Sequence, residues 1–153
     1  MAIHTVMNSS RMAGTYNVAF LVNCKITEDM DNGSVVSLVG PAVDEVEAFE
    51  IAAPAEGAEL HTLAIISEPE VMYDERLKQL SDFYNIAGEN GRVVRAYLPK
   101  HGDEFALSAE GFEGEPAVGQ TVGCNGTFKF AVGGTGFGKI VGILNDLFVV
   151  RVD

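Results

Sequence analysis

The sequence predicts an α+β protein that is mainly β, with a small β-barrel or sandwich core, one amphipathic helix and an extended N-terminal arm. Three observations support this prediction. Short β-branched segments recur along the chain between glycine-containing turns, as in small barrels and sandwiches. Residues 73–88 alone show the apolar period of a helix. Residues 1–14 show neither the apolar period of a helix nor the alternation of a strand.

These patterns divide the chain into an arm and one domain. A chain of 153 residues has the usual size of a single domain. We expect an extended arm over residues 1–14 and one β-rich domain over residues 15–153. Within the domain we expect N-terminal strands over 15–66, a helix over 73–88 and a barrel-like part over 91–153.

The N-terminal strands are predicted from β-branched runs and turn residues. Residues 15–23 and 35–39 are rich in Val, Leu and Phe, and Asn32-Gly33 lies between them. Asn-Gly between apolar runs is a strong hairpin signal, because both residues tolerate positive φ. Residues 63–66 form a short and fully apolar segment, which is typical of a strand buried on both faces.

The helix prediction depends on an apolar stripe and on its two ends. Asp74 and Glu75 lie in the first turn, where the helix dipole favours negative charge. Gly88 suits the left-handed position that follows a helix. Ile86 falls on the polar face, which makes it a candidate contact with a partner. The stripe contains Tyr73, Leu77, Leu80, Phe83, Tyr84 and Ala87.

The C-terminal part is predicted to be all β. In residues 127–132 the apolar residues Phe128, Phe130 and Val132 share a parity and therefore one face. Asn145-Asp146 is predicted to be a turn between the last two strands. The expected strands are 92–98, 104–108, 118–122, 127–132, 139–144 and 147–152.

The segment GGTGFGKI, residues 133–140, contains the glycine and lysine spacing of a phosphate-binding loop. Such a loop also needs a Ser or Thr after the lysine and a helix behind it. Ile140 occupies the hydroxyl position, and the β-branched tail that follows predicts strands. We therefore interpret the segment as a glycine-rich hairpin connection between strands.

Charge excludes several classes of partner. The chain has 22 acidic residues and 10 Lys and Arg residues, for a formal net charge of −12. Such a field repels phosphate backbones and acidic lipids, so we expect neither nucleic acid nor membrane as a partner. No apolar run is long enough for a membrane span, and the first residues lack the apolar core of a signal peptide. Synthesis in the cytoplasm is expected.

Two features could carry chemistry. Cys24 and Cys124 are a hundred residues apart and lie in no metal-binding motif, so we favour two buried reduced thiols over a disulfide. His101-Gly102-Asp103-Glu104 could bind a metal or perform acid–base chemistry. Gly-Asp is common in turns, however, and adjacent strand side chains diverge, so a structural turn is favoured. We expect no enzyme activity, cofactor or metal.

Four segments in one order resemble the head decoration, or capsid cement, proteins of tailed bacteriophages. They are VMYDER at 71–76, LSDFYNIAG at 80–88, RVVRAY at 92–97 and HGDEFALS at 101–108. The resemblance extends over about residues 35–152. The chain departs from the pattern by the insertion Glu89-Asn90-Gly91 after the predicted helix.

The resemblance implies a structural virion protein on the outer surface of an assembled capsid. Such a protein would stabilise the shell by clamping neighbouring subunits of the major capsid protein, and it could form a homotrimer. With the unpatterned arm, the resemblance makes the following residues candidate capsid contacts: Ile3, His4, Met7, Arg11, Met12, Tyr16, Ile86 and Phe137.

Two other readings remain open from the sequence. The chain could be a β-barrel module that binds a small molecule or a peptide without catalysis, which requires a deep pocket with converging polar groups. It could also be a hydrolase or metal enzyme that uses His101, Asp103 and Glu104.

Overall fold

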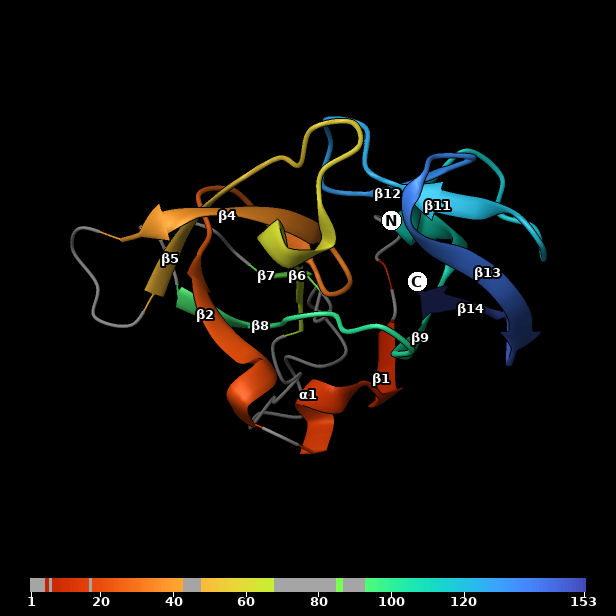
Figure 1. The fold of residues 1–153 in the computed structure, drawn as a ribbon, viewed down its shortest axis with the longest axis horizontal. Helices are drawn as coiled ribbons and strands as arrows, with labels where there is room; N and C mark the ends of the chain where they lie inside the picture. Colours follow the sequence, from red (N-terminus) through yellow and green to blue (C-terminus); the bar gives the residue numbers. More distant parts are fainter. Residues whose placement is uncertain (1–4, 6, 17, 43–47, 68–84, 87–92) are drawn as a thin grey trace, which may run out of the picture.

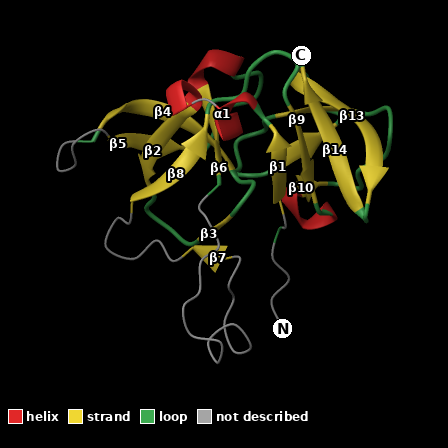
Figure 2. Cartoon of the chain, turned by 90° about the horizontal axis from the view of Figure 1, so that it is seen from below, coloured by secondary structure: helices red, strands yellow, loops and turns green. Residues whose placement is uncertain are grey.

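A computed structural model of the chain describes residues 5, 7–16, 18–42, 48–67, 85–86 and 93–153, and these are mainly β-strands (Figure 1). Five strands close into a barrel in the order β2-β5-β4-β6-β8. Seven strands form a sheet in the order β1-β9-β14-β13-β11-β12-β10. The barrel and the sheet lie side by side (Figure 2). The mainly β prediction and the predicted barrel are confirmed.

The barrel combines parallel and antiparallel pairs. β2 runs parallel to β5, and the other neighbouring pairs, including the closing pair of β2 and β8, are antiparallel. β2 and β4 are not neighbours, so the turn at Asn32-Gly33 does not form the hairpin that Asn-Gly predicts. The barrel strands are β2 (Leu21–Lys25), β4 (Val35–Pro41), β5 (Ala48–Ala52), β6 (Leu63–Ile66) and β8 (Val93–Tyr97).

The seven-stranded sheet joins segments that are far apart in the chain. β1 pairs with β9, β9 with β14, and β14 with β13. The sheet strands are β1 (Met7–Arg11), β9 (Glu104–Leu107), β10 (Phe112–Glu113), β11 (Thr121–Gly123), β12 (Phe130–Val132), β13 (Gly136–Leu144) and β14 (Leu147–Val152). The short helical elements are α1 (Ala13–Tyr16), η1 (Val18–Phe20), η2 (Leu60–Thr62) and η3 (Ala109–Gly111).

β6 is the barrel strand that separates the core inside the barrel from the core between the barrel and the sheet. All four of its residues are buried. Leu63 and Ile65 belong to the core between the barrel and the sheet, whereas Ala64 and Ile66 belong to the core inside the barrel. Because side chains alternate along a strand, a strand covered on both faces must be apolar throughout. The prediction of a buried strand over residues 63–66 is confirmed.

Phenylalanines form the centre of the core between the sheet and the barrel. Phe130 is fully buried, and its ring centroid lies 4.7 Å from that of Phe137, 5.6 Å from that of Phe105 and 6.4 Å from that of Phe112. Phe128 was expected on the same face, but residues 127–129 form a bend before β12, and Phe128 packs against the barrel core instead. The bend thus directs neighbouring phenylalanines into different cores.

The predicted helix is not shown. Residues 73–84 and 87–88 of the expected span lie outside the described residues. Asn85 and Ile86, which the prediction placed in the last helical turn, form strand β7 (Asn85–Ile86). β7 pairs antiparallel with β3 (Met30–Asp31). Strand pairing at this point therefore prevails over the helical period of the sequence.

The described part of the predicted arm is built into the fold. Residues 7–11 form β1 on the edge of the sheet, Met12 is completely buried, and α1 starts at Ala13. The expectation of an extended arm over residues 1–14 is therefore wrong for residues 7–14. A segment without sequence periodicity can still be ordered when its backbone pairs with a distant strand and one large side chain enters the core.

Residues 133–135 of the glycine-rich segment connect β12 to β13, which begins at Gly136; the segment is a connection between strands, as predicted, but not a hairpin. β12 and β13 both pair antiparallel with β11, which lies between them. The connection therefore crosses β11, and a Cβ atom on Gly123 would lie 2.5 Å from the backbone oxygen of Thr135. Glycine is needed where the two backbones cross. A strand, not a helix, follows Lys139, so the segment lacks the architecture of a phosphate-binding loop.

Asn145 and Asp146 form the turn between β13 and β14, as predicted, with φ values of 51° and 65°. Positive φ at both central residues favours Asn-Gly in such turns. We expect Asp146→Gly to raise the free energy of unfolding by about 0.5 kcal/mol, because glycine relieves strain in the left-handed region. Urea denaturation would measure the change. An unchanged or lower value would show that the Asp146 side chain compensates for the strain.

Candidate docking surface

Apolar side chains are concentrated on the free end of the β13–β14 hairpin. This end lies at the edge of the molecule remote from the barrel (Figures 1 and 2). Among the described residues, six large apolar side chains are exposed, and three of them, Val141, Ile143 and Leu144, belong to β13. Ile143 and Leu144 are 57% and 59% exposed. We call the following set the hairpin patch: Val141, Ile143, Leu144, Leu147 and Val149.

Strand register places Leu144, Leu147 and Val149 on one side of the hairpin, whereas Ile143 pairs with Phe148 on the opposite side. The core side of β14 carries Val150 and Val152, so Val149 lies on the opposite side, which we call the outer sheet face. Leu144 pairs with Leu147 beyond the last strand that could cover them. Leu144 and Val149 border a hollow of about 200 Å³, and its other lining residues are Asn8, Arg11, Glu104, Phe105 and Ala106.

A row of charged side chains crosses the outer sheet face next to the hairpin patch. Arg11 pairs with Glu104, Glu104 with Arg151, and Arg151 with Lys139 across four neighbouring strands. The row has three cations and one anion, and we call it the basic row. Arg11 Nη1 lies 3.3 Å from Glu104 Oε2, and the Arg11 side chain is 78% exposed. Arg151 and Lys139 are also exposed.

The outer sheet face thus has the properties of a protein-binding surface. Contiguous exposed apolar side chains with a charged rim are typical of interaction sites. The face is formed by paired strands, so it is rigid, and a partner would not have to order it on binding. Among the residues described for this face, no nucleophilic side chain lies beside a side chain that could act as its general base.

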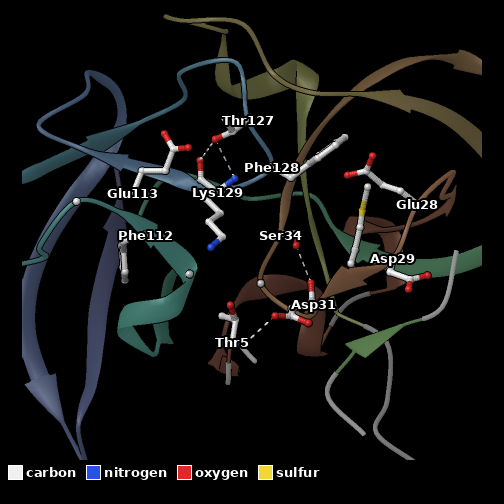
Figure 3. Close-up of a pocket in the computed structure, with 14 residues that line it drawn as sticks. Thr5, Glu28, Asp29, Asp31, Ser34, Phe112, Glu113, Thr127, Phe128 and Lys129 are labelled. Carbon is white, nitrogen blue, oxygen red and sulfur yellow. Dashed lines mark hydrogen bonds between the residues drawn. The ribbon is translucent and has the colours of Figure 1, made fainter. Parts of the chain in front are cut away.

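A second candidate is an acidic cleft between the barrel and the sheet, with a volume of about 740 Å³ (Figure 3). Glu28, Asp29 and Asp31 lie on its barrel side, and Glu113 and Lys129 lie on its sheet side. The volume is in the range of small-molecule sites. The cleft therefore offers four carboxylates and one ammonium group to a ligand.

The hydrogen bonds around this cleft stabilise its turns. The backbone N–H of Thr5 donates to Asp31 Oδ2 at 3.0 Å, and Ser34 Oγ donates to the Asp31 carbonyl at 2.7 Å (Figure 3). Within the described part of the chain, no three His, Cys, Asp or Glu side chains are grouped as a metal ion would require. The carboxylates of the cleft therefore do not form a recognisable metal centre.

The His101-Gly102-Asp103-Glu104 segment is a turn, as favoured from the sequence. Gly102 has a φ of 87°. Asp103 is buried, and its carboxylate accepts hydrogen bonds from the backbone N–H groups of Lys100 at 2.9 Å and Ala13 at 3.1 Å. Glu104 instead faces Arg11 on the outer sheet face. Because the two carboxylates are engaged separately, they do not converge with His101 on one ligand.

We expect Asp103→Ala to lower the free energy of unfolding by about 2 kcal/mol, because two partly buried backbone N–H groups lose a charged acceptor. Glu104→Ala removes an exposed ion pair and is expected to cost less than about 1 kcal/mol. Chemical denaturation of both variants would measure the difference. Equal costs would contradict the structural role of the Asp103 carboxylate.

Of the predicted contact residues, the structure brings Met7 and Arg11 to the sheet edge. Met7 is half-buried against the core, and Arg11 is exposed in the basic row. Ile3 and His4 lie outside the described residues. Tyr16 ends α1 and Ile86 lies in β7, and the structure describes only their backbones.

Two of the predicted contacts are core residues. Met12 is 0% exposed and Phe137 is 1% exposed, and both belong to the core between the sheet and the barrel. Phe137 was named as a candidate capsid contact in the glycine-rich segment 133–140, but β13 begins at Gly136 and turns the ring toward Phe105 and Phe130. Neither side chain offers a surface to a partner, so both are removed from the candidate contacts.

The two cysteines are free and buried in different cores, as favoured from the sequence. Cys24 lies inside the barrel, and Cys124 lies between the sheet and the barrel. Burial raises the pKa of the Cys24 thiol from 9.0 to about 12 and that of Cys124 to about 11.

We expect neither thiol to react with Ellman's reagent in the native protein at pH 8, and both to react in denaturant, because the thiolate is the nucleophile. The raised pKa values also give a direction for stability. Their contribution is complete below pH 9 and declines as the pH rises toward 11–12, since the unfolded chain loses these protons first. Rapid native labelling at pH 8 would contradict the burial.

Comparisons with known proteins add no assignment. No protein-family model matches the chain, and no match was found among curated proteins or solved structures. In the described part of the chain, no helix combines the length and the apolar character needed to cross a membrane.

Proposed function

We propose that the chain is a structural virion protein that binds the outer surface of an assembled phage capsid and stabilises the shell by clamping neighbouring major capsid protein subunits. The hairpin patch carries this proposal within the structure. Exposed apolar side chains on a rigid strand pair suit attachment to another protein surface. The order of the segments that resemble capsid decoration proteins supplies the class of partner.

The physical logic is that of a clamp. A shell that contains packaged DNA experiences outward pressure. Each bound copy adds contact area that an expanding shell would have to break, and the contribution is repeated at every equivalent site. A homotrimer would extend the clamp over more subunits, and oligomers of this kind close by rotational symmetry. No cofactor or metal takes part in the proposed function.

Co-sedimentation would test the proposal. Undecorated expanded shells of a tailed-phage major capsid protein would be incubated with purified protein. We expect saturable binding, and about tenfold weaker binding by Leu144→Ser. Val39→Ser is the matched control, because Val39 is an exposed apolar residue of the barrel and lies outside the hairpin patch. Absence of saturable binding by the wild-type protein across salt and pH would overturn the proposal.

The acidic cleft favours a second candidate function, which is the binding of a small molecule or peptide without catalysis. Its volume of about 740 Å³ carries this alternative, and its four carboxylates favour a cationic ligand. A panel of polyamines and arginine-containing peptides should then raise the melting temperature in a dose-dependent way. No shift at millimolar concentrations would exclude this candidate.

A further inference from the structure

We infer that the outer sheet face docks onto an acidic protein surface, with the basic row contacting carboxylates and with Leu144, Leu147 and Val149 of the hairpin patch filling an apolar depression beside them. The inference deepens the proposed function and rests on it for the identity of the partner. It adds to the proposed function the charge of the partner surface and the side chains of this chain that contact it.

Cations are concentrated on the outer sheet face, although the chain as a whole is acidic. The whole chain has a formal charge of −12, yet three of its ten Lys and Arg residues lie on one transverse row of one face. With Glu104 counted, the four side chains of this row sum to a charge of +2. Along the chain, the next acidic residue after Arg151 is Asp153, which follows the end of β14. An acidic protein that presents a local surplus of cations has an attachment site for acidic groups.

The pairing of neighbouring strands places the four charged residues of the basic row next to one another. The four strands β1, β9, β14 and β13 are neighbours, so the row spans roughly 14 Å at about 4.8 Å per strand. Glu104 lies between Arg11 and Arg151 in the row, and its Oε2 atom is 3.3 Å from Arg11 Nη1. Each guanidinium group retains N–H donors for a carboxylate of a partner.

The neighbouring side chains decide between classes of partner. Val149 lies next to Arg151 on the same side of β14, and Leu144 and Leu147 lie further along the hairpin. Nucleic acids would satisfy the cations but would not bury the apolar side chains, and the overall charge would repel them. A protein surface with carboxylates beside an apolar depression satisfies both features.

The test compares two double variants with the same formal charge of −14. Lys139→Gln/Arg151→Gln removes two cations from the basic row. Thr27→Asp/Asn125→Asp adds two acids at exposed loop positions outside the outer sheet face. Because the net charge is the same, any difference in binding reports the position of the charge. Thermal melts of both variants would first establish that they fold.

Two surfaces serve as probes. On assembled shells in about 0.1 M NaCl, we expect the basic-row variant to bind at least tenfold more weakly than the wild type, and the loop variant to bind within twofold of it. Wild-type affinity should fall with salt more steeply than that of the basic-row variant. The second probe is carboxylate-modified polystyrene beads, which are apolar and acidic, and the same order of affinity is expected on them.

The outcomes separate the two proposals. Equal binding of both double variants to shells that capture the wild type would overturn the acidic-surface inference and leave the proposed function intact. Absence of wild-type binding to shells would overturn the proposed function. In that case the beads would test the acidic-surface inference. Equal binding of the two double variants to the beads would overturn this inference, and weaker binding of the basic-row variant would support it.

Discussion

Gly138→Ala is expected to lower the free energy of unfolding by roughly 3 kcal/mol or more, which is a large part of the stability of a domain of this size. Gly138 lies in β13 between β11 and β14. A Cβ atom at this position would lie 2.2 Å from the backbone oxygen of Arg151 and 3.3 Å from Cα of Val152. The obstacle is backbone of a paired strand, so a side-chain rotation cannot relieve the clash.

Gly142 provides the matched control for this prediction in the same strand. A Cβ atom there would meet no heavy atom within 4 Å. Gly142→Ala should therefore be neutral or raise stability by up to about 1 kcal/mol, because alanine reduces the entropy of the unfolded chain. Urea denaturation of both variants would measure the contrast. Similar stabilities for the two alanine variants would contradict the close approach of β13 and β14 at Gly138.

Phe130→Ala is expected to cost about 3–5 kcal/mol, the usual range for a buried phenylalanine. Phe130 is fully buried and contacts three other phenylalanine rings, with Phe137 the nearest at 4.7 Å between centroids. Deleting the ring would leave a cavity at the centre of the core between the sheet and the barrel. Calorimetry or denaturant titration would measure the loss.

Phe128 is the comparison for Phe130, since it has the same chemistry two residues earlier in the chain. It is only partly buried and packs on the barrel core. Phe128→Ala should cost distinctly less, about 1–2 kcal/mol, in proportion to the smaller apolar area that it buries. An equal or larger cost for Phe128→Ala would contradict the assignment of Phe130 to the centre of the core.

Much of the strand content could be predicted because its signals are local. The apolar run 63–66, the β-branched run 147–152 and the turn residues Asn145-Asp146 each indicate their structure within a few positions. Asn32-Gly33 shows the limit of this reasoning. The turn forms there, but the flanking strands pair with other strands of the fold. These pairings depend on residues distant in the sequence, which the local pattern does not show.

The candidate surface was harder to predict than the fold. Arg11, Glu104, Arg151 and Lys139 are far apart in the sequence, and they meet only through the pairing of β1, β9, β14 and β13. Arg11 was named from the sequence as a candidate contact, because it lies in the unpatterned segment 1–14 of a chain that resembles capsid decoration proteins. A usable signal was present in the last hairpin, because a two-residue turn at Asn145-Asp146 pairs Leu144 with Leu147 and exposes both on one side.

The position of β14 affects how the protein can be made. Of the described strands it is the last in chain order, yet it lies inside the sheet between β9 and β13. During translation the sheet therefore stays open at this place until β14 leaves the ribosome. Until then β9 and β13 present unpaired backbone to other nascent chains. A chain that stops before residue 147 should consequently aggregate and should not yield a smaller folded protein.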